Sequence, residues 1–89
     1  MLKISRIGKR GVILTLVGRM DSESLPEMKR LLAAEKGRRM GLDLKDLTLV
    51  DRDAVSFLGQ CEADSIKLKN CPAYIREWIR RERASSEES

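Results

Sequence analysis

Carboxylates are the side chains whose number and spacing come nearest to a reactive site in this sequence. Four of them stand close together, at Asp43, Asp46, Asp51 and Asp53. Oxygen ligands of this kind suit Mg²⁺, and aspartates at strand ends can also accept a phosphoryl group. The second chemistry needs a larger five-stranded sheet and a lysine and hydroxyl set that we cannot place in 89 residues. We therefore interpret the four acids as solvated carboxylates and helix caps, and we expect no metal and no cofactor.

The other common reactive side chains are absent or isolated. The chain contains no histidine, which removes histidine-based acid-base catalysis, Ser-His or Cys-His nucleophile pairs and histidine metal ligands. Its two cysteines, Cys61 and Cys71, lack the spacing of a metal knuckle or a redox pair. We expect both to be buried, reduced and apolar in character. The sequence therefore favours a protein that is not an enzyme.

The positive charge of the chain does not by itself indicate a nucleic-acid partner. There are 18 Lys and Arg against 14 Asp and Glu, a net charge of +4, but most basic residues stand beside acids. The three aromatic residues show no spacing typical of a base-stacking platform, so no nucleic acid is expected. No leader peptide and no apolar run long enough to span a bilayer is apparent. We expect a cytoplasmic location without direct membrane insertion.

The first elements that must position these side chains are two strands. Apolar residues alternate over residues 2–7, and residues 12–17 form a second run that is almost continuously apolar. The glycines at positions 8 and 11 predict a hairpin turn between them. The alternating strand is typical of an edge, and the second of a central strand covered on both faces.

Capping residues predict where the first helix begins and ends. Ser24 as the cap, Pro26 in the first turn and Glu27 three residues on form a capping box, and Gly37 ends the helix. Residues 40–44 then alternate as a strand. The segment 47–50 is expected to be an approach to the next helix, with Leu47 and Leu49 partly exposed.

The rest of the chain alternates again between helix and strand. A helix starts at Asp53, a short strand covers residues 65–69, and Pro72 starts a last helix. The order is β-β-α-β-α-β-α in a single domain over residues 1–83, followed by a disordered tail over 84–89. This predicts an α/β fold with a four-stranded mixed sheet, an N-terminal β-hairpin and three helices. Function is expected at the edge formed by strand carboxyl ends and helix amino ends.

Three short motifs, in order, resemble those of the STAS domain family, which is named from sulphate transporters and antagonists of anti-sigma factors. The run from Gly18 to Asp21 is similar to the glycine-x-apolar-aspartate signature of that family. Leu42-Asp43-Leu44 is similar to its leucine-aspartate-leucine strand, and Val50-Asp51 to the apolar-aspartate step before its second helix. The resemblance covers nearly the whole chain. It implies a compact member, because the family usually has another strand near the end.

The resemblance also implies a regulatory position. In the antagonist members the aspartate is followed by two hydroxyl residues and a glycine, and a partner kinase phosphorylates the second hydroxyl. Here the phosphoacceptor-equivalent position is Asp53, and Ala54 replaces the glycine. Asp53 would supply a permanent charge where a phosphate would supply about −1.5 to −2. Asp is also a good N-cap, so capping of the helix and partner contact both stay open.

The function implied is a non-enzymatic interaction module of bacterial signalling, resembling an anti-sigma factor antagonist that is not switched by phosphorylation at Asp53. Its partner would be an anti-sigma factor of serine-kinase type. The alternative is a cytoplasmic subunit or accessory of a membrane transport complex for lipids or anions. The exposed first strand also leaves room for a homodimer. The expected partner-binding residues are Asp21, Ser22, Leu49, Asp51, Arg52, Asp53 and Ser56.

Overall fold

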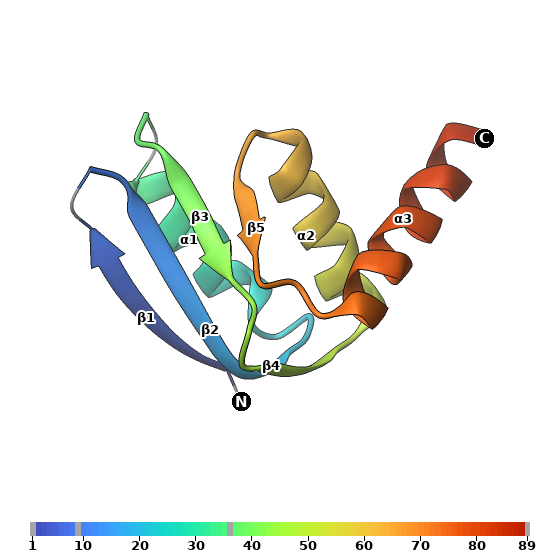
Figure 1. Cartoon of the computed structure of the whole chain (residues 1–89), viewed down its shortest axis with the longest axis horizontal. Helices are drawn as coiled ribbons and strands as arrows, with labels where there is room; N and C mark the ends of the chain where they lie inside the picture. The colour runs from blue at the N-terminus through green and yellow to red at the C-terminus, as the bar shows by residue number, and fades with distance from the viewer. Residues whose placement is uncertain (1, 9, 36, 89) are drawn as a thin grey trace.

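The computed structural model describes residues 2–8, 10–35 and 37–88, with side chains as far as Ala84. Within these residues, five strands and three helices follow one another in the order β-β-α-β-β-α-β-α (Figure 1). The elements are β1 (Leu2–Gly8), β2 (Val12–Met20), α1 (Leu25–Ala34), β3 (Met40–Asp43), β4 (Leu47–Val50), α2 (Arg52–Ala63), β5 (Lys67–Lys69) and α3 (Ala73–Glu88). The predicted α/β class, hairpin, mixed sheet and three helices are confirmed. The predicted number of strands is wrong, because residues 47–50 form a strand.

Strand β2 organises the sheet. It pairs antiparallel with β1, from Leu2 opposite Gly18 to Gly8 opposite Val12. On its other side it pairs in parallel with β3 over its first half and with β4 over its second half. The register shifts between Gly18 and Arg19, where Gly18 has a φ of 102° and donates its N–H to the carbonyl of Asp46 at 3.1 Å. This irregularity lets two short strands share one long partner.

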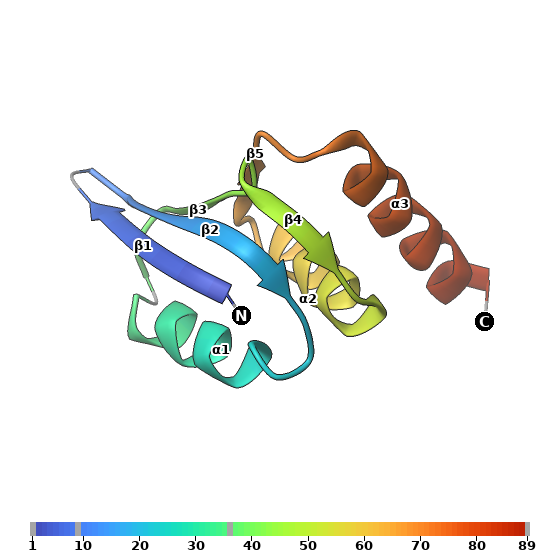
Figure 2. The same ribbon diagram turned by 90° about the horizontal axis from the view of Figure 1, so that it is seen from below.

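The helices α1 and α2 lie on the same side of the sheet (Figure 2). On that side Val12, Leu14 and Leu16 of β2 are completely buried, whereas Ile13 and Thr15 on the opposite side are only half-buried. The expectation that this strand is covered on both faces is therefore wrong. The run of apolar residues in β2 conceals an alternation between a helix-covered face and an open one.

Helix α3 packs on α2 and extends away from the sheet (Figure 1). Its stripe of Ile75 and Ile79 is buried, with Trp78 partly buried beside them, as the helical spacing predicts. The helix continues through Glu88, so the segment expected to be a disordered tail begins inside it. The disorder expected for residues 84–89 stays a prediction, and Ser89 lies outside the described residues.

One core joins all of these layers. Buried side chains from β2, β3, β4, α1, α2 and α3 form a single cluster. Cys61 belongs to it, while Cys71 is only half-buried against it, and both are free thiols. The prediction that both cysteines are buried therefore holds for Cys61 alone. The cluster consists of Val12, Leu14, Leu16, Met20, Met28, Met40, Leu42, Leu44, Leu47, Val50, Ala54, Val55, Leu58, Cys61, Ile75 and Ile79.

Candidate functional site

Asp51 joins the two loops that follow β2 and β4. Its Oδ1 accepts the N–H of Ala54 at 2.8 Å, which caps α2. Its Oδ2 accepts the N–H of Ser22, in the loop before α1, at 3.0 Å. A single carboxylate thus fixes the start of one helix and the loop leading to another, because its two oxygens can accept bonds independently.

This arrangement corrects the predicted role of Asp53. Asp53 was expected to cap α2, but the cap is Asp51, and Asp53 lies within the first turn of the helix with its side chain exposed. Its carboxylate forms no ion pair or side-chain hydrogen bond with any group that the structure describes. An acid in the first turn is favoured by the positive end of the helix dipole without needing a bonded partner. Asp53 therefore presents its charge to solvent.

The predicted capping box at the start of α1 is not formed. Ser24 occupies the N-cap position, but its side chain makes no capping hydrogen bond, and its backbone is already helical. Its hydroxyl donates instead to Asp21 Oδ1 at 3.3 Å, and the same oxygen accepts the N–H of Glu23 at 3.1 Å. Asp21 therefore closes the turn before the helix. Its other oxygen lies 3.4 Å from Arg19 Nε.

Arg52 and Ser56 are both exposed on α2. Arg52 Nε lies 3.4 Å from Oε1 of Glu82 on α3, so the start of α2 is linked to α3 across the surface. Ser56 lies one turn after Arg52, on the exposed side of the helix. Both residues lie beside Asp53, as the sequence predicts.

Apolar side chains extend this edge beyond the expected residues. Leu49 on β4 is 58% exposed, whereas Leu47, also expected to be partly exposed, is buried in the core. Tyr74, at the start of α3, is 50% exposed, and its hydroxyl donates to the carbonyl of Thr48 at 3.1 Å. This bond links the start of α3 to the backbone of β4. We call the exposed set formed by Ser22, Leu49, Arg52, Asp53, Ser56 and Tyr74 the loop-edge surface.

Tyr74 is the residue of this surface that sequence reasoning missed. The sequence does indicate that Tyr74 is exposed, through its position in the helical repeat. Tyr74 precedes Ile75 and lies outside the stripe formed by Ile75 and Ile79. That position indicates a side chain directed away from the core. It could not indicate the neighbour, because the contact with β4 depends on where α3 lies.

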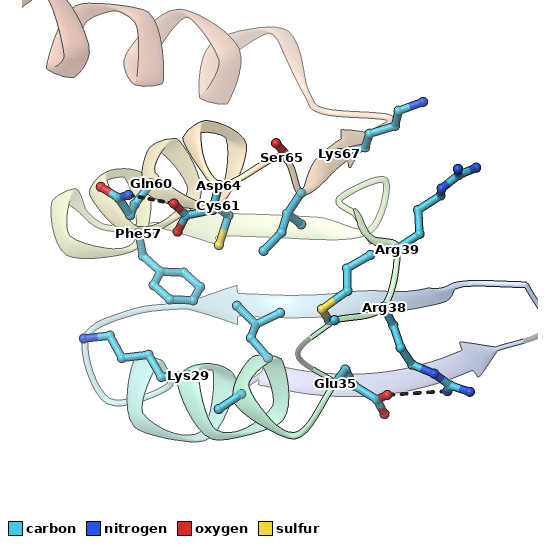
Figure 3. Close-up of a pocket in the computed structure, with 15 residues that line it drawn as sticks. Lys29, Glu35, Arg38, Arg39, Phe57, Gln60, Cys61, Asp64, Ser65 and Lys67 are labelled. Atoms are coloured by element: carbon cyan, nitrogen blue, oxygen red, sulfur yellow. Dashed lines mark hydrogen bonds and ion pairs between the residues drawn. The ribbon is translucent and has the colours of Figure 1, made fainter.

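A groove between α1 and α2 has a volume of about 1050 Å³. Figure 3 shows Phe57 reaching from α2 toward α1, with Glu35 paired to Arg38 after the end of α1 and Gln60 bonded to Asp64 at the C-terminal end of α2. Its apolar floor also includes Leu32, Met40, Cys61 and Ile66. No residue of the loop-edge surface lines it.

Cys61 is the only nucleophilic thiol in the groove wall, and its surroundings make it inert. Burial, and to a smaller extent the charge of Asp64, raise its pKa from 9.0 to about 12. The thiol is therefore protonated at neutral pH, and the thiol form is a poor nucleophile. Among the described residues no group of three or more His, Cys, Asp or Glu side chains lies close enough together to hold a metal ion.

No protein-family model matches the sequence, and a search of curated proteins finds no significant match. None of the helices in the described part of the chain is both long enough and apolar enough to cross a membrane. The geometry at the loop edge is therefore the basis on which a function is proposed.

Proposed function

We propose that the protein is a non-enzymatic interaction module resembling an anti-sigma factor antagonist, and that it binds its partner through the loop-edge surface. The observation that carries the proposal is the exposed carboxylate of Asp53 in the first turn of α2. Asp51 already caps that helix, so folding does not require Asp53 to make the capping bond. In the motifs that resemble those of the STAS family, Asp53 stands at the position of the hydroxyl residue that a partner kinase phosphorylates in the antagonist members.

The chemistry of the surroundings suits a small protein interface. Leu49 and Tyr74 provide exposed apolar and aromatic contact area, and residues of these kinds, with Arg, supply much of the binding energy in protein interfaces. Arg52 and Asp53 lie next to each other with opposite charges. Such a pair selects a partner by charge complementarity, since a mismatched surface leaves both charges unpaired.

A fixed charge at Asp53 makes the module constitutive. A phosphorylated hydroxyl at this point would carry about −1.5 to −2 charges and could be removed by a phosphatase. The carboxylate of Asp53 carries a charge of about −1, which no phosphatase can remove. We therefore propose that binding depends on the amounts of the two proteins and is not switched at this residue. The proposed partner is a cytosolic anti-sigma factor with a serine-kinase fold.

The first experiment compares what the wild-type protein, Asp53→Lys and Asp64→Lys retain from native cell extract, after circular dichroism shows that all three are folded. Asp64 is the matched control, because it undergoes the same change of charge at the other end of α2. We expect a kinase-fold ATPase to be retained by the wild type and by Asp64→Lys, and lost with Asp53→Lys. Recovery of transporter subunits, or equal recovery by all three proteins, would contradict the proposal.

A second variant tests the proposed ancestry of the position. Asp53→Ser places a hydroxyl in the first turn of α2, where the resemblance puts the phosphoacceptor. We expect the recovered kinase to phosphorylate Asp53→Ser in the presence of ATP and Mg²⁺, and phosphorylation to change binding. Ser56 serves as the internal control, since the wild type should stay unmodified. A variant that is neither phosphorylated nor altered in binding would argue against an inherited switch geometry.

A further inference from the structure

The side of the sheet opposite α1 and α2 is uncovered in the described structure (Figure 2). Strand alternation directs Lys3, Ser5 and Ile7 of β1 toward this side, each beside its partner Val17, Thr15 or Ile13 on β2. Ile7 is 59% exposed and Val17 37% exposed. Two apolar points therefore lie on this open face, one near each end of the β1–β2 ladder.

Next to Ile13 the face is hollowed, because the paired residue on β3 is Gly41. A Cβ built on Gly41 would lie 3.6 Å from the carbonyl oxygen of Lys67, 3.7 Å from Lys69 Cε and 3.9 Å from Ile13 Cγ1, so a methyl group would fit there in ordinary contact. Glycine inside a strand often marks the close approach of another group. We call this cavity of about 340 Å³ the Gly41 socket. Its walls include Ile7, Arg10, Ile13, Arg39 and Lys69.

The charged side chains that line the Gly41 socket are all positive. Arg10, Arg39 and Lys69 form no ion pair within 4.0 Å with any side chain that the structure describes. The acid directed to the same face is Asp43, and its Oδ1 accepts hydrogen bonds from the N–H of Lys45 and from the Asn70 side chain. An occupant with negative charge is therefore favoured.

The shape and charge of the Gly41 socket favour one kind of binding partner over others. A second copy of the chain docked through this same face would bring the same cations to it and be repelled. A single-stranded nucleic acid would need aromatic side chains on which its bases could stack, but the aromatic residues, Phe57, Tyr74 and Trp78, belong to α2 and α3. An apolar socket surrounded by cations suits the apolar face of a helix whose flanks are acidic.

We propose that the open face of the sheet binds an acidic amphipathic helix of a partner protein. One apolar side chain of that helix enters the Gly41 socket, and its acidic flank pairs with Arg10, Arg39 and Lys69. Ile13 and Val17 are four positions apart along β2, a distance of about 13 Å. A helix rises about 1.5 Å per residue, so residues seven or eight positions apart lie on one face of it, span about 11–12 Å and reach both points. This face does not include the loop-edge surface, so the proposal stands apart from the function proposed above.

The test uses a synthetic peptide of about 18 residues, long enough to form a helix on binding, with Leu along one face and Glu on both flanks. A second peptide carries Lys in place of Glu. We expect fluorescence anisotropy to show binding of the acidic peptide only. In NMR spectra of the labelled protein, the amide shifts should change at Ile7, Ile13 and Gly41.

Three variants locate the contact. Gly41→Ala partly fills the socket and Gly41→Val fills more of it, so affinity should fall in that order, by about tenfold or more for Val. Lys69→Glu should weaken binding to a similar degree. Lys29→Glu is the matched control, because it makes the same charge change on α1, behind the sheet, and should leave affinity unchanged.

Four outcomes would overturn the proposal. Equal loss with Lys29→Glu and Lys69→Glu would show unspecific charge attraction. Shifts confined to α1 and α2 would move the contact to the opposite side of the sheet. Retained affinity in folded Gly41→Val would exclude the socket. Binding to anionic phospholipid vesicles without binding to the acidic peptide would assign the face to a membrane surface.

Discussion

At the scale of single residues, Asp51 shows how one carboxylate both starts a helix and joins two loops. Replacement by Ala removes the cap at Ala54 and the bond to Ser22, and we expect a loss of about 1–2 kcal/mol in the free energy of unfolding. Asp51→Asn keeps one oxygen that can accept the capping bond, so its loss should be smaller. Urea denaturation of the wild type, Asp51→Ala and Asp51→Asn measures these differences in the free energy of unfolding.

Asp53→Ala is the control for this prediction. Asp53 lies two residues away in the same helix, but it forms no capping bond, so only its favourable position in the helix dipole is lost. That contribution is at most about 1 kcal/mol. A loss with Asp53→Ala as large as that with Asp51→Ala would show that the cap is assigned to the wrong residue.

Cys61 gives a second prediction at this scale, one that depends on pH. The unfolded chain loses the thiol proton near pH 9, whereas burial raises the pKa in the folded protein to about 12. Between these values the folded state holds more protons, so stability falls as the pH rises, by up to about 1.4 kcal/mol per pH unit. We expect urea denaturation from pH 8 to pH 10.5 to show a steeper fall for the wild type than for Cys61→Ala. Equal slopes would contradict the assignment.

At the scale of elements, the strands and helices that sequence reasoning found are those with a clear period or a clear boundary. The segment 47–50 has neither, since Leu49 and Val50 are adjacent apolar residues that cannot both belong to one face of a regular strand. It forms β4 because β2 is long enough to pair with it beyond β3, with a shift of register between Gly18 and Arg19. Such pairing depends on a partner distant in sequence, which local patterns do not describe.

Gly59 lies where α2 packs on α3. A Cβ at this position would lie 3.5 Å from Ile79 Cγ2 and 3.9 Å from Arg83 Cγ, both ordinary contact distances. Gly59→Ala should therefore stabilise the protein by about 0.5–1 kcal/mol, because alanine loses less backbone freedom in a helix. Gly59→Leu should destabilise it by about 1–3 kcal/mol, since a larger side chain separates the helices. Thermal unfolding followed by circular dichroism distinguishes these signs, and destabilisation by Ala would show that the helices lie closer together.

At the scale of the whole molecule, some parts of the candidate site can be predicted from the sequence and others cannot. The loops carrying Asp21 and Asp51 follow from the positions of strands and helices along the chain. The roles of the single residues in these loops could not be predicted, because Asp and Ser are both good N-caps and stand at neighbouring positions. Only the folded geometry decides which of them caps the helix. The contribution of Tyr74, and the open face of the sheet, depend on where α3 lies. Helix α3 could have covered the sheet, and it packs on α2 instead.

The position of α3 also decides how the molecule unfolds. Ile75 and Ile79 are buried in the same cluster as the residues of β2 and α2, so α3 should not separate from the rest before global unfolding. Trp78 on α3 is the only tryptophan, and its fluorescence reports on that helix alone, whereas far-ultraviolet circular dichroism reports on all elements. We expect the two urea transitions of the wild type to coincide, as two-state unfolding requires. Ile79→Ala should lower stability by about 2–4 kcal/mol and shift both transitions together. A fluorescence transition at lower urea than the dichroism transition would instead make α3 a separate unit docked on a core that is stable without it.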